Sequence, residues 1–505
     1  MGAHTSRDRG KGAIRKDGGH GEAGQACPRH AQGADEGPLH HLPPPLAEAV
    51  ARCRARAENE PAPRHFRACR PGGGGRAAFQ VSQRSKETIP GPRGGILARH
   101  LTAYEADPAG FLDDCRRRYG DVFRFDTGVV VVTDPDLVAE VLARTNRDSV
   151  PNANPLQGGR FPTAEQTRRW MDARQLAAPT LRSAALPARL PAVRGALAAD
   201  LDALDGTWFD PSEVCWAICV RALLPLYLPD ESPALVDAVL ASFDAARDTA
   251  EAAVRVPSWM PSRLRRRVRD ADQRVRDTIV PMLGDGAPAG TDTMLGHIRS
   301  QPGAVPGDIA MGAMGFTLLG AIGTMGAAWC WILYYLAAHP EVADRVREEA
   351  TAAPDVSGDP ARALPYTWAF AQEVLRARPP AWLLGRDAVT SVTLGDVEVP
   401  AGTAIMFSPY LLHHDERWWP DDPQRFAPER WLGAGRPHAP GAYLPFASGP
   451  RGCLGSHLGL AVLALTAAHI ATRKRLEVPG LDAVTTYFGP STLTPSGMRA
   501  RLTPR

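Results

Sequence analysis

One cysteine of the chain lies in a loop that suits it for holding a metal. Cys453 belongs to the segment Phe446–Gly455 (FASGPRGCLG), and a helical pattern follows from Ser456 to about Thr472. Glycines on both sides allow a tight turn that exposes the sulfur. Backbone N–H donors and the N-terminus of the following helix favour the thiolate, which is the form of cysteine that binds metals. A buried structural cysteine is the alternative interpretation.

A second group of residues pairs opposite charges on one predicted helix. Glu373 and Arg376 are three residues apart, so their side chains share one helical face and can form a salt bridge. The downstream segment 423–431 (PQRFAPERW) adds another arginine, Arg430. Pairs at this spacing are common on solvated helix surfaces, where they contribute little to stability. Taken alone, these residues indicate no function.

The cysteine segment resembles the haem-binding loop of the cytochromes P450, which is written FxxGxRxCxG. Phe446, Gly449, Arg451, Cys453 and Gly455 match every fixed position of that pattern, and four motifs follow the order of the family. The resemblance implies a mainly α fold with small β-sheets, the P450 fold. It also implies haem b as the cofactor, with Cys453 as the ligand of its iron. A thiolate ligand pushes electron density onto haem iron and favours O–O cleavage.

In this family the pair of charges has a structural role. The ExxR motif binds an arginine from a downstream segment, and the buried network holds the cysteine loop in place. Glu373, Arg376 and Arg430 are the corresponding residues of this chain. The resemblance therefore implies that these three residues position the loop and do not react.

Four residues resemble the family's contacts to the haem propionates. The segment Trp170–Arg174 (WMDAR) resembles the WxxxR helix, Arg386 takes the place of another propionate-binding arginine, and Arg451 lies in the cysteine loop. Each arginine alone would ordinarily be a solvated surface residue. A dianionic haem edge needs several planar donors, and three arginines in the family's order would supply them.

The central helix departs from the family pattern. Members carry an acid followed by a threonine beside the oxygen-binding face, and residues 320–325 (GAIGTM) align with that signature. Thr324 retains the threonine, whereas Gly323 replaces the acid that relays protons from solvent and Met325 replaces a second threonine. One hypothesis, which we prefer, is that a substrate group or ordered water relays protons. The other is a rearrangement, desaturation or peroxide-driven reaction.

The resemblance also implies where a substrate binds. The expected pocket residues come from the central helix and from the stretch after the ExxR helix: Met314, Leu318, Leu319, Ala381, Trp382, Leu383 and Leu384. Nearly all are apolar, which predicts an apolar, medium-sized substrate such as a terpenoid or another secondary-metabolite intermediate. The alternative is that some of them belong to the core only.

Electrons are expected from separate proteins, a ferredoxin and its reductase, because the sequence shows no flavin or ferredoxin-like segment. The docking surface is expected on the cysteine side of the haem, where positive charge would come from Arg168, Arg169, Arg473, Lys474 and Arg475.

Two further functions stay open. One is a peroxygenase or isomerase that needs no external electrons, and the other is a haem binder without catalytic activity, against which the retained Thr324 argues.

Local patterns predict the elements that carry these residues. Asp107 is an N-cap for a helix that ends at Gly120, and residues 122–133 read as a hairpin around an Asp-Thr-Gly turn. Helical patterns dominate from there, with short strand-like pieces such as Val392–Val399. The class is therefore mainly α.

The stretch Met311–Ala338 holds no charged residue and is long enough to cross a bilayer. It could be a membrane span or a central helix buried in a large helical domain. The second interpretation is favoured, because five glycines let a flat partner approach closely and no companion span flanked by Lys or Arg occurs. We expect no membrane anchor.

Composition excludes several function classes. Hydrophobic residues make up 44% of the 505 residues and charged residues 22%, which is ordinary for a globular protein. The net charge is +3 and no basic run is interleaved with aromatic residues, so we expect no nucleic-acid partner. The eight cysteines form no CxxC pair, which argues against a zinc site or a disulfide framework and favours a reducing cytoplasm.

The chain divides into two parts by composition. Residues 1–85 are rich in Gly, Arg, Pro, His and Ala without an apolar period, so this part is predicted to be disordered. A mis-assigned start is the competing hypothesis, because a valine codon such as that of Val81 can serve as a bacterial start. Residues 86–505 are predicted to form the haem domain of a bacterial, soluble protein, about four-fifths of the chain.

Overall fold

A computed structural model describes residues 89–92, 99–152, 163–182, 185–230, 232–251, 262–284, 292–303, 305–354, 356, 358–490 and 492–505. These residues all belong to one compact unit of the chain, residues 38–505. The predicted disorder or mis-assigned start of residues 1–85 lies outside the described residues.

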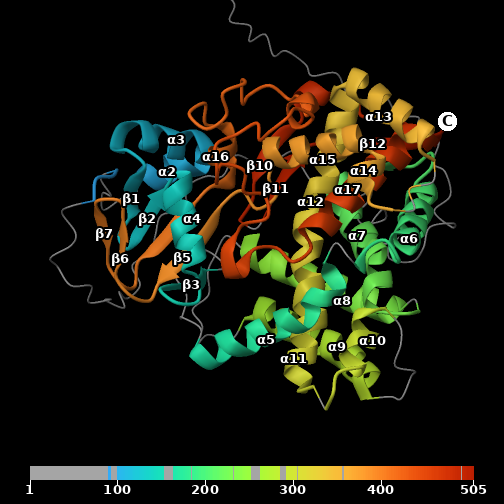
Figure 1. Ribbon diagram of the computed structural model, residues 1–505, viewed down its shortest axis with the longest axis horizontal. Coiled ribbons are helices and arrows are strands. Elements are labelled where there is room, and N and C mark those ends of the chain that lie inside the picture. The colour runs from blue at the N-terminus through green and yellow to red at the C-terminus, as the bar shows by residue number, and fades with distance from the viewer. Residues whose placement is uncertain are drawn as a thin grey trace, which may run out of the picture. The chain divides into compact units, whose positions relative to one another are not determined.

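Helices make up most of the described chain, as the sequence predicts (Figure 1). Asp107 caps the helix α3 by accepting a hydrogen bond from the Gly110 N–H, and Asp134 caps α4 in the same way. The helices are α2 (Arg99–Ala106), α3 (Pro108–Tyr119), α4 (Pro135–Ala143), α5 (Ala164–Leu181), α6 (Leu190–Ala203), α7 (Pro211–Tyr227), α8 (Pro233–Glu251), α9 (Arg263–Gly284), α10 (Met294–Arg299), α11 (Gly307–Met311), α12 (Thr317–Ala338), α13 (Pro340–Ala352), α14 (Pro360–Ala363), α15 (Pro365–Ala377), α16 (Pro409–His414) and α17 (Ser456–Arg473), with short helical turns η3 (Gly312–Phe316), η4 (Pro428–Trp431), η5 (Gly449–Arg451) and η6 (Leu481–Ala483).

Short strands form small sheets beside the helices. The strands are β1 (Val122–Asp126), β2 (Val129–Val132), β3 (Ser149–Asn152), β4 (Trp208–Phe209), β5 (Leu384–Ala388), β6 (Val392–Leu394), β7 (Val397–Val399), β8 (Ala404–Phe407), β9 (Lys474–Glu477), β10 (Thr485–Phe488), β11 (Leu493–Ser496) and β12 (Ala500–Pro504). The largest sheet has the order β1-β2-β8-β5-β3, in which only β2 and β8 are parallel. A three-stranded sheet has the order β4-β12-β9, and β6–β7 and β10–β11 are hairpins.

Most local predictions agree with these elements. The hairpin β1–β2 turns at the expected Asp-Thr-Gly sequence. The strand-like piece Val392–Val399 is instead two paired strands, β6 and β7. Gly395, at φ 58°, supplies the left-handed turn between them, a conformation that glycine adopts without steric cost.

The apolar central stretch forms one helical rod from α11 through the π-helix η3 to α12. It packs against α7, α17 and the strand β11. Among the described helices this rod, Gly307–Ala338, is long and apolar enough to cross a membrane, and 71% of its most apolar window is buried inside the protein. Such burial is expected of a core helix.

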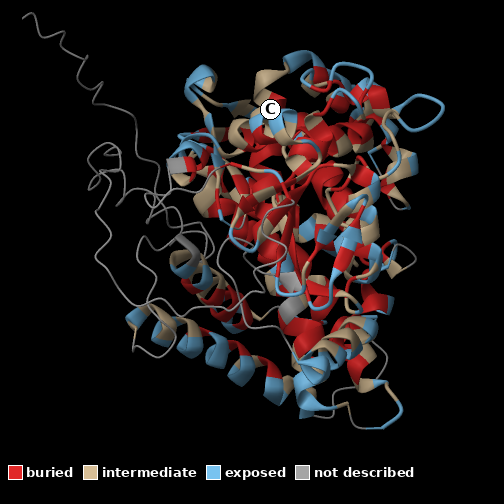
Figure 2. Ribbon diagram, turned by 90° about the vertical axis from the view of Figure 1, so that its left-hand side faces the viewer, coloured by how far each residue is buried: buried red, intermediate tan, exposed pale blue. Residues whose placement is uncertain are grey.

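The main core surrounds this rod. Trp329, Trp331 and Ile332 of α12 are fully buried, together with apolar residues of α7 and α17. A second, smaller core includes Val138 of α4 and Phe407 of β8 beside the largest sheet. Figure 2 shows the buried residues gathered in the interior, while the peripheral helices turn exposed residues outward. The rod is therefore a buried helix against which the residues of a site can pack.

Candidate active site

The loop that carries Cys453 is fixed by its backbone. The Cys453 N–H donates to the carbonyl of Phe446 at 2.8 Å, which closes the turn. Ala447 and Gly449 both have left-handed backbones, at φ 52° and 71°. A Cβ on Gly449 would lie 2.3 Å from the carbonyl oxygen of Leu142, so only glycine lets the loop pack against α4. The α17 helix begins three residues after the cysteine.

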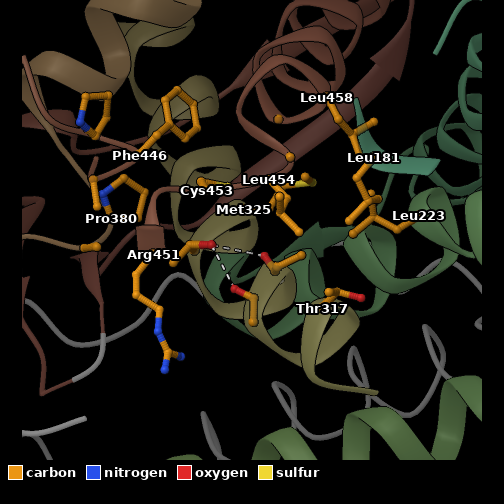
Figure 3. A pocket seen from close by; sticks show the side chains of 18 of the residues that line it. Leu181, Leu223, Thr317, Met325, Pro380, Phe446, Arg451, Cys453, Leu454 and Leu458 are labelled. Carbon is orange, nitrogen blue, oxygen red and sulfur yellow. Dashed lines mark hydrogen bonds between the residues drawn. The ribbon is translucent and has the colours of Figure 1, made fainter. Parts of the chain in front are cut away.

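Cys453 faces a cavity of about 400 Å³ between α12 and the cysteine loop. Figure 3 shows Arg451 on one side of Cys453 and Leu181, Leu223 and Leu458 on the other. The walls come from α5, α7, α12, the segment after α15 and the loop itself, and most of their side chains are apolar. The cavity thus has one cationic edge and one apolar edge.

Loss of hydration to the surrounding protein is the largest influence on the pKa of the Cys453 thiol, although the side chain faces the cavity. It raises the pKa of Cys453 above its ordinary value, and a hydrogen bond from the Gly455 backbone and the charge of Arg174 act in the opposite direction. The loop therefore supplies the donor that the sequence predicts, but its effect is smaller than that of burial. Coordination to a metal cation deprotonates a thiol outright, so a metal would complete the conversion to thiolate.

Arg174 and Arg451 line the cationic edge, whereas Arg386 is not among the lining residues but lies near enough for its charge to act on Arg451. Arg174 donates to the carbonyl of Gly452, and Arg451 lies over the ring of Trp170 with 3.3 Å between its guanidinium carbon and the ring centroid. Arg386, on β5, donates to Thr145 Oγ1 at 3.0 Å and to the carbonyl of Gly385. Among the described residues, none of these guanidinium groups has a hydrogen bond to a carboxylate.

These cations act on one another. Burial lowers the pKa of Arg451 to about 10, and the charges of Arg386 and Arg174 contribute to that decrease. Burial also lowers the pKa of Arg386 to about 10. Mutual repulsion in a partly buried site is costly unless an anion neutralises it. The structure therefore brings together the arginines that the sequence selects, as expected for an edge that binds a dianion.

The ExxR residues form a buried network. Arg376 donates two hydrogen bonds of 2.9 Å to the Glu373 carboxylate, and Arg430 donates a third at 3.1 Å. The backbone of Ala427 and the indole of Trp431 donate to the same carboxylate. Both arginines also donate to backbone carbonyls of residues 413–425. Every oxygen of this buried acid is satisfied, so the segment before the cysteine loop is held rigidly.

A histidine that the sequence did not single out connects this network to the cysteine loop. His413 Nδ1 lies 3.0 Å from the carbonyl of Arg376, and its Nε2 lies 2.8 Å from the backbone N of Leu444, two residues before Phe446. Since the backbone N–H must donate, Nε2 is the unprotonated nitrogen and Nδ1 carries the proton. Burial is the main cause that lowers the pKa of His413 well below 6.5. The neutral ring thus acts as a bridge.

Because the buried His413 ring is neutral, we expect the protein to lose stability in acid. Because the folded-state pKa is depressed, below pH 6.5 the unfolded chain takes up a proton that folded His413 does not. The free energy of unfolding should then fall by about 1.4 kcal/mol per pH unit from this residue. Urea unfolding at a series of pH values between 7 and 5 should show that the unfolding free energy falls less steeply with decreasing pH in His413→Asn than in the parent protein. An equal dependence on pH in the two proteins would contradict the assignment.

Thr324 and Gly323 lie on different faces of α12. Thr324 lines the cavity, and its hydroxyl can donate to the carbonyl of Gly320 at 3.2 Å or of Ala321 at 3.3 Å. Gly323 is not among the residues that line this cavity. A Cβ at Gly323 would point to the ring of Phe243 on α8, 3.0 Å from Cε2. The position of the family's acid is thus packed against an aromatic ring.

This packing changes what a carboxylate at position 323 would do. Gly323→Asp should cost about 1–3 kcal/mol of unfolding free energy, because the side chain must displace Phe243. Removing that ring in Gly323→Asp/Phe243→Ala should return part of the loss, as a double-mutant cycle by urea unfolding would show. Gly320→Ala is the control, since a Cβ on Gly320 would meet no other atom within 4 Å and alanine favours a helix. A Gly323→Asp variant as stable as Gly320→Ala would refute the contact.

The predicted substrate residues divide into two groups. Ala381 and Leu384 line the cavity. The others, Met314, Leu318, Leu319, Trp382 and Leu383, are not among its lining residues and lie in or against the main core. On α12 the lining positions repeat at helical spacing from Thr324: Thr317, Gly320, Ala321, Thr324, Met325 and Ala328. Counting in steps of three and four from Thr324 would have found them, whereas Leu181, Leu223 and Tyr227 come from other helices and leave no local signal.

One residue of the expected docking surface is placed differently from the prediction. Lys474 is only 3% exposed, and its ammonium binds the carboxylates of Asp202 and Asp205 at 2.6 and 2.7 Å. It therefore cannot present a charge to a partner, and that part of the prediction is wrong. Arg473 and Arg475 beside it are exposed, as is Arg168. Arg169 is exposed too but pairs with Glu165 and Asp308.

Comparison with known proteins decides the family. A family model described as Cytochrome P450 matches residues 89–285 and 306–499. The chain belongs to the cytochrome P450 family. The expected family, mainly helical fold and haem-thiolate cofactor are thereby confirmed.

Several curated P450 relatives are similar over parts of the chain. Cyclooctat-9-en-7-ol 5-monooxygenase of Streptomyces melanosporofaciens is 35% identical over 234 residues, 44% of this chain and 50% of that protein. Cytochrome P450 monooxygenase sphH of Aspergillus fumigatus is 33% identical over 256 residues, 47% of each chain. A cytochrome P450 of Caenorhabditis elegans is 26% identical over 83% of this chain and 94% of its own length. For the first two of these relatives, the chain spans about half of the relative's length. The match to the Caenorhabditis elegans protein is at lower identity but spans nearly all of that protein.

The residues of this P450 fit a haem. Cys453 would hold the iron, and the three arginines with Trp170 would hold the propionates, which explains guanidinium groups gathered without carboxylates among the described residues. Leu181, Leu223 and Leu458 would face the apolar part of the porphyrin.

Proposed function

We propose that this P450 inserts one oxygen atom of O₂ into an apolar small molecule, with electrons from separate redox proteins. The observation that carries the proposal is the cavity itself, in which Cys453 and Thr324 both line walls that are otherwise mostly apolar. Bound haem supplies the activation of molecular oxygen. The protein supplies the thiolate ligand, a water-excluding pocket and a hydroxyl beside it.

The apolar walls favour a substrate that is mainly hydrocarbon. Cavities of this kind bind ligands through apolar contact and orient them through a few polar groups. A terpenoid or a similar secondary metabolite would suit such walls. In support, one relative is named for its action on cyclooctat-9-en-7-ol, a hydrocarbon skeleton with one hydroxyl group. We also propose that the protein is cytoplasmic and that a ferredoxin and its reductase are the electron donors.

Thr324 holds a proton in this cavity. Its hydroxyl has one hydrogen, which can go to either of two α12 carbonyls, and its lone pairs are available to a donor in the cavity. Because Phe243 packs against the position of the family's acid, the proton must arrive from water or from a substrate group. A hydroxyl placed in this way can pass a proton on without itself being consumed.

Replacing the hydroxyl tests this role. Thr324→Val keeps the volume of the side chain and should lower product formed per NADPH by about 100-fold, while oxygen consumption continues. Thr466→Val is the matched control, since Thr466 is buried in α17 and makes the same bond to the carbonyl four residues earlier. The assay compares ferredoxin, reductase and NADPH with hydrogen peroxide alone. Turnover with peroxide only, unaffected by Thr324→Val, would favour a peroxygenase and refute the proposal.

A further inference from the structure

Two neighbouring residues just after the helix α4, Thr145 and Asn146, each accept a hydrogen bond from one arginine. The Nε of Arg386, on β5, donates to Thr145 Oγ1 at 3.0 Å, and the Nε of Arg451, in the cysteine loop, donates to Asn146 Oδ1 at 2.9 Å. Both arginines are thus bound through Nε. Nη1 and Nη2 of Arg451 and Nη2 of Arg386 have no hydrogen bond to the described residues, so they remain available to another acceptor.

Thr145 is oriented by the end of α4 and by the largest sheet. Its hydroxyl lies 3.3 Å from the carbonyl of Val141, one helical turn earlier, and donates its hydrogen there. The lone pairs of the hydroxyl are therefore left for Arg386. Thr145 also forms a β-bridge with Ser149, the first residue of β3, and β3 pairs with β5, which carries Arg386. The sheet thus brings this arginine to the threonine.

Asn146 has a backbone conformation that few residues with a side chain adopt. Its φ is 74°, in the left-handed region, and its N–H donates to the carbonyl of Ser149 at 2.7 Å. An arginine only donates, so Oδ1 faces Arg451, and the amide nitrogen donates to Sδ of Met171 on α5 at 3.3 Å. Met171 follows Trp170, whose ring lies under Arg451. Asn146 therefore fixes Arg451 at Nε while Trp170 supports its face.

The two arginines are held close together against their own repulsion. Burial lowers the pKa of Arg451 to about 10, and the charge of Arg386 adds to that effect. Two partly buried like charges destabilise a protein unless an anion neutralises them. A left-handed asparagine at the same place adds a second local cost, and such costs gather where they prepare a site for a ligand.

We propose that Thr145 and Asn146 are positioning residues that orient Arg386 and Arg451 toward the propionates of the haem. The dipeptide would fix both guanidinium groups before the cofactor binds, so that less side-chain freedom is lost on binding. The inference concerns retention of the cofactor. It therefore depends on the haem of the P450 family and not on the reaction proposed above.

The rate at which haem leaves the protein tests the role of Asn146. Asn146→Gly removes the amide but permits a φ of 74°, whereas Asn146→Ala removes the same amide and strains the backbone. Both variants should release haem to excess apomyoglobin about 10-fold faster than the parent protein does. Asn146→Ala should be the less stable of the two in urea. Unchanged release from Asn146→Gly would refute the assignment.

Thr145→Val and Thr145→Ser form a matched pair for the other arginine. Valine keeps the shape of the side chain and removes the acceptor, whereas serine keeps the hydroxyl and loses a methyl group. Thr145→Val should release haem about 10-fold faster than the parent, and Thr145→Ser should stay within about twofold of it. Equal release from the two variants would mean that packing matters and the hydroxyl does not, which would contradict the proposal.

Haem dimethyl ester separates orientation of the arginines from support of the fold. Its esterified propionates carry no charge, so the charge-assisted bonds to the arginines are lost. Asn146→Gly and Thr145→Val should therefore release the ester at the rate of the parent protein. If they released the ester about 10-fold faster as well, the dipeptide would only support the fold, and the proposal would be overturned. The reduced carbon monoxide complex of each variant should keep its thiolate-type spectrum, and loss of that spectrum would mean that the cysteine loop itself had moved, against the proposal.

Discussion

Replacing Cys453 by serine is expected to abolish the haem-thiolate character of the protein. A serine hydroxyl does not give up its proton as a thiol does on binding a metal, so the electron-donating ligand is lost. Turnover should fall by at least about 1000-fold, equivalent to roughly 4 kcal/mol of activation free energy. The optical spectrum of the reduced protein with carbon monoxide should change from the thiolate type, and product analysis with redox partners would measure the loss.

Another cysteine provides the control for this experiment. Cys115 is a buried free cysteine of α3 and does not line the cavity, so Cys115→Ser should retain both the thiolate spectrum and turnover. A Cys453→Ser protein with an unchanged spectrum, or with turnover within about 10-fold of the parent, would exclude Cys453 as the iron ligand.

Glu373→Gln should have the largest effect on stability. The change removes the charge that two buried arginines share, and an uncompensated buried charge typically costs about 3–5 kcal/mol. Because Arg376 also binds the carbonyl of His413, the ring that supports the cysteine loop should shift as well. Urea unfolding would measure the stability, and the ratio of haem to protein absorbance would measure cofactor retention.

An exposed acid serves as the comparison. Glu398→Gln neutralises a carboxylate on the exposed strand β7 and should change the unfolding free energy by no more than about 0.5 kcal/mol. If Glu373→Gln destabilised the protein by less than about 1 kcal/mol and retained its haem, the network would not support the loop as described.

Residues close together in sequence were predicted best. The cysteine loop, the pairing of Glu373 with Arg376 and the capped helix after Asp107 all depend on local spacing, which the sequence displays directly. The arginines at the cationic edge come from distant segments, and only the family pattern connected Arg174, Arg386 and Arg451 in advance.

Other features depend on contacts that no local pattern reveals. The sequence identified Gly323 as the position of a missing acid but not the ring of Phe243 against it, because that ring comes from a helix about 80 residues earlier. His413 gave no signal, since its role rests on two backbone groups rather than on side chains of recognisable type. The π-helix η3 likewise lies within a stretch that reads as an ordinary helix.

The clustered arginines have a consequence for the abundance of this protein in a cell. Since Arg174, Arg386 and Arg451 repel one another, a dianion that settles among them stabilises the native state by mass action, in proportion to the logarithm of its concentration. Porphyrin supply would then govern how long each newly made chain survives proteases.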